Sequence, residues 1–117
     1  MSATALLSAS QAGICPLHAL PRTVKHGIVS QAVLTVPGLR LTLMHFAAGQ
    51  ELSEHTSTAR ALVQVFAGSC DFSFEGQTRR LKAGDLLHLP PGLPHSVQAV
   101  ENLTLLLTQV APPPAGK

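Results

Sequence analysis

Histidine is the residue type in this sequence best suited to holding a ligand or a metal, and six histidines occur among its 117 residues. A neutral imidazole carries one nitrogen that donates a hydrogen bond and one that accepts, and it is the commonest side-chain ligand for transition metals. Two histidines stand beside strong turn signals: His55 follows Gly49, and His95 follows the turn at Pro90-Pro91-Gly92. Both are candidates for holding a ligand or a metal.

Other catalytic chemistry has little support. Cys15 and Cys70 form no CxxC pair, so neither a zinc knuckle nor a disulfide framework is indicated. Cys70 begins a strand without an identifiable base, and Ser96 beside His95 lacks a third group to orient it. No paired-carboxylate arrangement is recognisable, because Asp85 is expected to cap its own turn.

The elements that must position these residues are short and β-prone, and Gly and Pro separate them. We expect about eight to ten antiparallel strands without helical crossovers, as in a sandwich or barrel. Phe72 and Phe74, followed by Glu75-Gly76, predict a hairpin. Along 39–46, strand alternation places His45 on one face with the leucines, which predicts that His45 points inward.

Composition predicts one globular domain divided into an N-terminal arm, partly mobile (1–21), a barrel (22–110) and a Pro-rich tail (111–117). The net charge of +2 and the absence of an extended basic cluster argue against nucleic acid as a partner. No apolar run is long enough to cross a membrane, and the N-terminus has no basic region typical of export. We therefore expect a cytoplasmic protein, and the 12% charged content suggests a homodimer that buries apolar surface.

Two segments resemble the two sequence motifs of the cupin family. Gly49, His55 and Gly68 match the first motif. The matches to the second motif are Gly84, Pro90, Gly92 and His95. The resemblance implies an all-β, cupin-type double-stranded β-helix, which is a jelly-roll barrel, in which His55 and His95 converge on an interior pocket.

The resemblance also implies a metal site, but this chain departs from the usual ligand set. Cupins generally use two histidines and a glutamate from the first motif and the histidine of the second, whereas here Ser57 and Ala61 stand at the second histidine and glutamate positions of the first motif. His55 and His95 are the remaining metal candidates. One divalent transition metal (Zn, Fe, Mn or Ni) and no metal at all both stay open, because two neutral imidazoles fill only part of a coordination shell.

Four further side chains are candidates for the pocket. His45 would supply a third nitrogen if its strand end reaches the site. His88 lies on the opposite face from Leu87 and Leu89, and Gln64 faces outward if Ala61 faces inward. The full predicted pocket is His45, His55, Ser57, Gln64, His88 and His95.

Three functions are compatible with this pattern. The first is a small cupin that binds a small organic molecule inside the barrel, with or without a metal. The second is a metal-dependent oxygenase, isomerase or lyase that uses His55, His95 and a non-standard third ligand. The third is a non-catalytic interaction or sensor module. Fold analogy does not choose between them.

Overall fold

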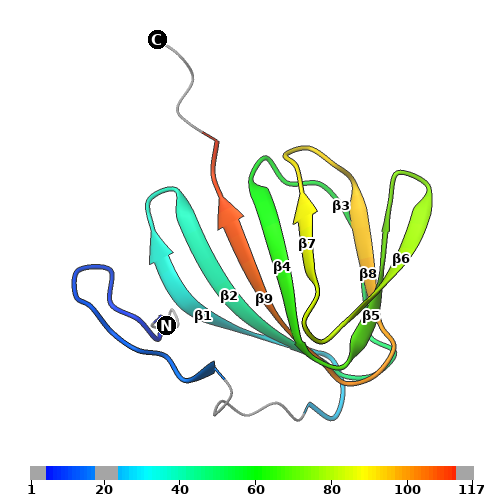
Figure 1. The fold of residues 1–117 in the computed structure, drawn as a ribbon, viewed down its shortest axis with the longest axis horizontal. Helices are drawn as coiled ribbons and strands as arrows, with labels where there is room; N and C mark the ends of the chain where they lie inside the picture. Colours follow the sequence, from blue (N-terminus) through cyan, green and yellow to red (C-terminus); the bar gives the residue numbers. More distant parts are fainter. Residues whose placement is uncertain (1–4, 18–23, 113–117) are drawn as a thin grey trace.

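The computed structural model describes residues 5–17 and 24–112, and within these ranges it contains strands and no α-helix (Figure 1). The strands are β1 (Ile28–Val36), β2 (Leu39–Phe46), β3 (Glu51–His55), β4 (Arg60–Ala67), β5 (Ser69–Phe74), β6 (Gln77–Lys82), β7 (Leu86–Leu89), β8 (His95–Ala99) and β9 (Leu103–Val110). The predicted all-β class is confirmed.

The strands form two antiparallel sheets, ordered β1-β2-β9-β4-β7 and β3-β8-β5-β6. Figure 1 shows the five-stranded sheet running from β1 in cyan to β7 in yellow, with the four-stranded sheet beside it. The chain crosses between the sheets at β2–β3, β3–β4, β4–β5, β6–β7, β7–β8 and β8–β9. This alternation is the jelly-roll connection, and it brings strands far apart in the sequence into contact.

Glycines at positive φ end several strands where the sequence predicted turns. The predicted hairpin is present: Phe74 pairs with Gln77, and Glu75 (φ 53°) and Gly76 (φ 73°) form the two-residue turn. Two successive positive φ values are the requirement of a type I′ turn, which matches the twist of the flanking strands. Gly92, after Pro90 and Pro91, has φ 80° and donates its N–H to the carbonyl of Ser57 at 2.8 Å.

The main core fills the space between the sheets. It takes Phe46, Val63 and Leu105 from the five-stranded sheet and Phe72 and Val97 from the four-stranded sheet, each at most 4% exposed. Burial of these side chains is the main driving force that closes one sheet over the other.

A second apolar cluster lies on the outer face of the five-stranded sheet. Val33, Leu43 and Leu106 are buried there, and Leu7, Cys15 and Leu17 of the N-terminal segment pack over them. The segment is also tied to β1, because the N–H groups of residues 6 and 7 donate to the carbonyls of residues 32 and 33 at 3.1 and 2.8 Å. Residues 5–17 therefore cover part of this face.

The predicted division into arm, barrel and tail stays a prediction. Residues 1–4, 18–23 and 113–117 lie outside the described residues, and they include His18 and most of the predicted tail. Within the described part of the chain, no helix has the length and apolar character needed to cross a membrane.

The two cysteines are both free and belong to different cores. Burial raises the pKa of the Cys70 thiol to about 11, and the negative charge of Asp71 adds to the shift. Cys15 is half-buried, and it packs on the outer face of the five-stranded sheet rather than between the two sheets. We expect iodoacetamide at about pH 8 to label Cys15 and spare Cys70 in the folded protein, because the reactive thiolate of Cys70 is scarce.

Mass spectrometry after labelling checks this expectation, with urea-unfolded protein as the control in which both thiols react. Equal labelling of the two thiols in folded protein would contradict the burial of Cys70.

The raised pKa of Cys70 also predicts that the stability of the fold decreases as the pH rises from about 9 to about 11, because in that range the unfolded thiol loses its proton and the folded one keeps it.

Candidate ligand-binding site

The register of the four-stranded sheet brings the two motif histidines together. β3 and β8 are adjacent antiparallel strands, and His55 is paired directly across from His95. Their ring centroids lie 4.4 Å apart, with the ring planes at 63°. The predicted convergence is present, although the strands are neighbours in one sheet rather than facing each other across the barrel.

Both rings are held in the same tautomer by the backbone. The Nδ1 of His55 lies 2.9 Å from the carbonyl oxygen of Ser53, and the Nδ1 of His95 lies 2.9 Å from that of Leu93. A carbonyl oxygen only accepts, so each Nδ1 carries the proton and donates it. In the neutral rings, Nε2 is therefore the atom with a lone pair, able to accept a hydrogen bond or bind a cation.

The two histidines share a small apolar cavity between the sheets, with a volume of about 50 Å³. His95 is buried, whereas His55 is exposed, so the histidine end of this inner cavity is the end nearer solvent. The cavity has room for about two groups of water or methylene size. Its lining is Met44, Phe46, Leu52, His55, Val63, Phe72, Leu89, His95, Val97, Leu105 and Leu107.

The structure places His45 on the wrong side of the sheet for this cavity. Met44 and Phe46 line the inner cavity, so the intervening His45 points to the outer face with Leu43. There it is 5% exposed, and its Nδ1 lies 3.1 Å from the Oγ1 of Thr104. The prediction that His45 shares a face with the leucines is right, but that face is the one beneath the N-terminal segment.

Gln64 and His88 also lie outside the inner cavity. Ala61 and Val63 face the main core, so Gln64 of the same strand points outward and is exposed. His88, on β7, is exposed as well, and its Nε2 accepts a hydrogen bond from Nη1 of Arg60 at 2.6 Å. The prediction that these two side chains line the pocket is therefore wrong, because strand alternation along β4 and β7 turns both of them away from the barrel interior.

Comparison with known proteins places this geometry in a family. Residues 45–115, from the end of β2 to beyond β9, match the family of AraC-like ligand-binding domains. The chain belongs to this family. A comparison with curated protein sequences finds no significant match.

Solved structures share the fold of this AraC-like ligand-binding domain. A cupin superfamily protein from Desulfitobacterium hafniense is 21% identical, with a TM-score of 0.81 over 93% of this chain and 100% of that one. A conserved protein of unknown function from Streptococcus pyogenes is 24% identical, with a TM-score of 0.78 over 97% of each chain. A mutant salicylate 1,2-dioxygenase from Pseudoaminobacter salicylatoxidans is 25% identical, with a TM-score of 0.68 over 80% of this chain and 29% of that one. The predicted cupin jelly roll is confirmed.

The residues at the metal-ligand positions of this domain do not fit a stable divalent-metal centre. Ala61 is a buried apolar residue, and Ser57 does not line the inner cavity. Among the described residues, no group of three or more His, Cys, Asp and Glu side chains is placed to hold a metal. Two neutral nitrogens leave half of a tetrahedral shell empty and the charge of the ion uncompensated.

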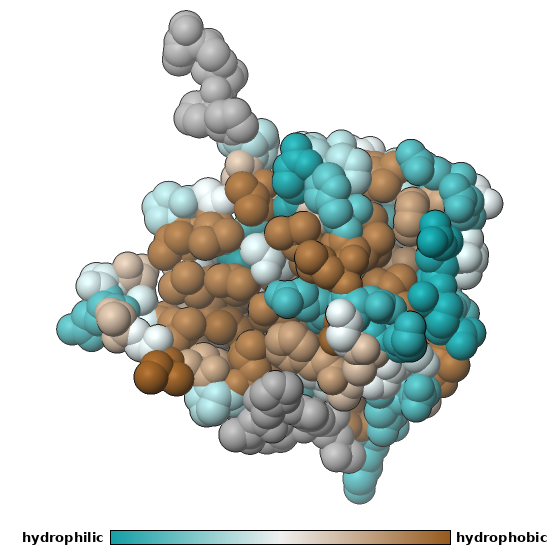
Figure 2. Space-filling model, viewed as in Figure 1, coloured by the Kyte–Doolittle hydropathy of each residue, from teal (hydrophilic) through white to brown (hydrophobic). Residues whose placement is uncertain are grey.

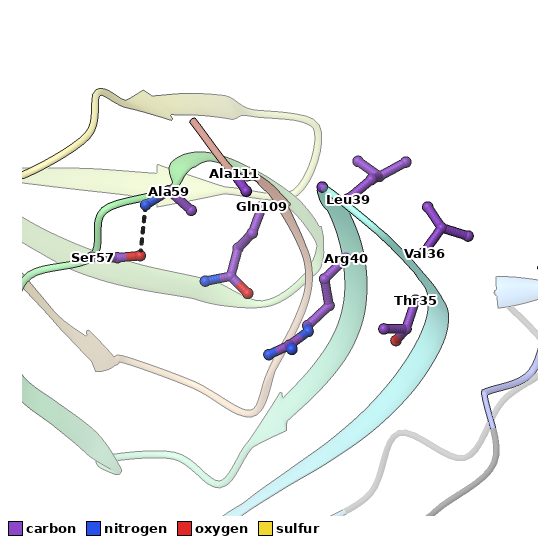
Figure 3. A pocket seen from close by; sticks show the side chains of 9 residues that line it. Thr35, Val36, Leu39, Arg40, Ser57, Ala59, Gln109 and Ala111 are labelled. Carbon is purple, nitrogen blue, oxygen red and sulfur yellow. Dashed lines mark hydrogen bonds between the residues drawn. The ribbon is translucent and has the colours of Figure 1, made fainter. Parts of the chain in front are cut away.

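Ser57 lines a second and larger cavity instead, about 270 Å³ in volume, at the β1–β2 turn and the end of β9. Figure 3 shows the side chains of Arg40, Ser57 and Gln109 directed into this mouth cavity from three separate segments. Arg40 and Gln109 were not among the pocket residues predicted from the sequence. A usable signal was present, because Arg40 shares its strand face with Met44 and Phe46, which are large and apolar.

Proposed function

We propose that this AraC-like ligand-binding domain binds a small organic molecule inside the barrel. An apolar part of the ligand occupies the inner cavity, and a hydrogen-bond donor of the ligand reaches His55 and His95. The observation that carries the proposal is the pair of imidazoles whose Nδ1 atoms are both committed to backbone carbonyls, beside an apolar cavity. A site that is mostly apolar with a few converging polar atoms is typical of small-molecule binding.

The family and one structural neighbour support an organic ligand. The family is described as ligand-binding, and the dioxygenase among the neighbours is named for salicylate, an organic acid. The metal-enzyme alternative is less favoured, because only two of the usual four ligands of the cupin motif are present. We assign no reaction to the site.

The test is a cavity-filling substitution, Val97→Phe. Val97 is 4% exposed and lines the inner cavity, so an added ring occupies the space that an alkyl group of the ligand would fill. The probe is hexan-1-ol, which has an apolar chain and one hydroxyl donor. We expect the wild type to bind it at millimolar concentrations and the variant to bind at least about tenfold more weakly, measured by NMR titration of the amide resonances of β3 and β8.

The matched control is Val100→Phe, which makes the same change at a side chain that is 43% exposed and does not line the inner cavity. Its affinity for hexan-1-ol should equal that of the wild type. Equal binding by all three proteins, or no binding by the wild type, would contradict the proposal. One divalent metal per chain in protein purified without chelator would instead support the metal-enzyme alternative.

The homodimer remains a prediction. Val29, Leu86 and Val110 are 51%, 63% and 39% exposed, and strand parity puts all three on the outer face of the five-stranded sheet. Figure 2 shows hydrophobic surface gathered over this sheet. These exposed apolar side chains support burial of the face against a second copy. The cytoplasmic location and the absence of nucleic-acid and membrane partners also stay predictions.

A further inference from the structure

Among the described residues that line the mouth cavity, Arg40 is the only one with a positively charged side chain. It lies on β2, directly across from Gln109 of β9. Both side chains belong to the inner face of the five-stranded sheet, because Met44 and Leu107, an even number of residues away on the same strands, line the inner cavity. Figure 3 shows the two side chains extending the same way from their strands.

No carboxylate neutralises Arg40 in the described part of the chain. All six Asp and Glu side chains of the protein are described, and none of them lines the mouth cavity. The two ion pairs among the described residues join Arg80 to Asp71 and Lys82 to Asp85. The guanidinium therefore keeps its charge and its fork of five donors for another partner.

Ser57 and Gln109 add neutral donors to the same cavity. The Oγ of Ser57 accepts a hydrogen bond from the N–H of Ala59 at 3.1 Å. That bond uses a lone pair of the hydroxyl and leaves its hydrogen to donate. The carboxamide of Gln109 carries two further N–H donors. One cation and two neutral donors without a carboxylate form an environment that favours an anion.

The mouth cavity lies next to the inner cavity along the sheet. Leu107, in the wall of the inner cavity, and Gln109, in the wall of the mouth cavity, are two residues apart on one face of β9. Two residues of extended strand span about 7 Å. A head group at Arg40 would therefore lie about the length of a short alkyl chain from the inner cavity.

From this placement we infer that the ligand is an organic anion, with a carboxylate held by Arg40, Gln109 and Ser57 at the mouth of the barrel. The inference rests on the proposed function, because it names the chemical class of the molecule that occupies the barrel. A carboxylate matches the fork of an arginine with two parallel hydrogen bonds, which gives orientation as well as affinity. The apolar part of the ligand then points toward the inner cavity, and the donor that reaches His55 and His95 is a second polar group of the ligand.

The experiment compares hexanoate with hexanamide, its neutral counterpart of nearly the same shape, by NMR titration at neutral pH. We expect the wild type to bind hexanoate at least about tenfold more tightly than hexanamide, since charge-assisted hydrogen bonds are roughly twice as strong as neutral ones. Arg40→Gln should remove this preference. Arg40→Lys, which keeps the charge without the planar fork, should retain part of it.

The matched control is Arg60→Gln, which removes one positive charge from the outer face of β4 and should keep the full preference for hexanoate. Thermal unfolding of each variant confirms that it is folded. Binding of hexanamide as tight as that of hexanoate, or an equal loss in the Arg40 and Arg60 variants, would overturn the carboxylate inference and leave the proposed function standing. Failure of both probes to bind while hexan-1-ol still binds would overturn the carboxylate inference alone, whereas failure of all three probes would overturn the proposed function as well.

Discussion

Replacement of Gly68 by alanine is expected to destabilise the protein by at least about 3 kcal/mol, which is a fall in melting temperature of roughly 12 °C or more for a domain of this size. Gly68 has φ 81°, a conformation that costs an L-residue about 1–2 kcal/mol. A Cβ at this position would also overlap the carbonyl oxygen of Asn102 and lie 3.1 Å from the Cα of Leu103.

The atoms that a Cβ at Gly68 would meet belong to the backbone. The expected loss of stability therefore exceeds the loss caused by the unfavourable φ angle alone. Asn102 is itself fixed, because its Oδ1 accepts a hydrogen bond from the N–H of Ala48 at 2.9 Å. Moving Asn102 away from a new methyl group would disturb the contact between the β8–β9 and β2–β3 connections. Relief by a side-chain rotation is not available.

Gly76→Ala is the control for the dihedral angle. Gly76 has φ 73°, and a Cβ there would meet nothing within 4 Å, so we expect a loss of only about 1 kcal/mol. Urea unfolding followed by circular dichroism measures both variants. Equal losses at the two glycines would show that the close approach of Gly68 to Asn102 does not contribute.

Phe46→Ala is expected to cost about 3–5 kcal/mol, because it removes a large side chain that is 1% exposed in the main core. Phe46 also lines the inner cavity, so its loss would join new empty space to an existing void. Because no other atoms would take the place of the lost contacts, we expect the loss of stability to lie near the upper end of about 3–5 kcal/mol.

Phe74→Ala is the matched comparison, since Phe74 is only partly buried against the same core. We expect a clearly smaller loss, because some of the Phe74 ring already meets solvent. Denaturant unfolding of both variants provides the measurement. If Phe74→Ala proves as destabilising as Phe46→Ala, the packing of the inner cavity described above is incorrect.

Much of the turn framework and the central pair of the site could be predicted from residue types and spacing. The hairpin at Glu75-Gly76 follows from the two-residue spacing between β-prone runs and from Gly76, which adopts positive φ without a steric cost, so it needs no tertiary contact. The meeting of His55 and His95 followed from the resemblance of two motifs to a known family. The physical role of Gly68 was not accessible in this way, because the atom that excludes a side chain belongs to Asn102, a residue remote in the sequence.

The remaining pocket residues show where strand patterns stop being informative. Alternation along β2 correctly grouped His45 with the leucines and Arg40 with Thr42. It did not say which group faces the barrel. Since leucines are most often found in a core, their face was assigned to the interior, and Arg40 was left out of the candidate site.

The amino-acid sequence alone determined the all-β class, the turns at glycine and proline, and the identity of the two histidines that meet. Only the tertiary structure decided which face of each strand is the inside. The physical reason is that the five-stranded sheet buries apolar side chains on both faces, one against the second sheet and the other beneath the N-terminal segment. When both faces of a strand are apolar, the alternation of side chains shows which residues share a face. It does not show which of the two faces points into the barrel, because the packing of distant elements decides that.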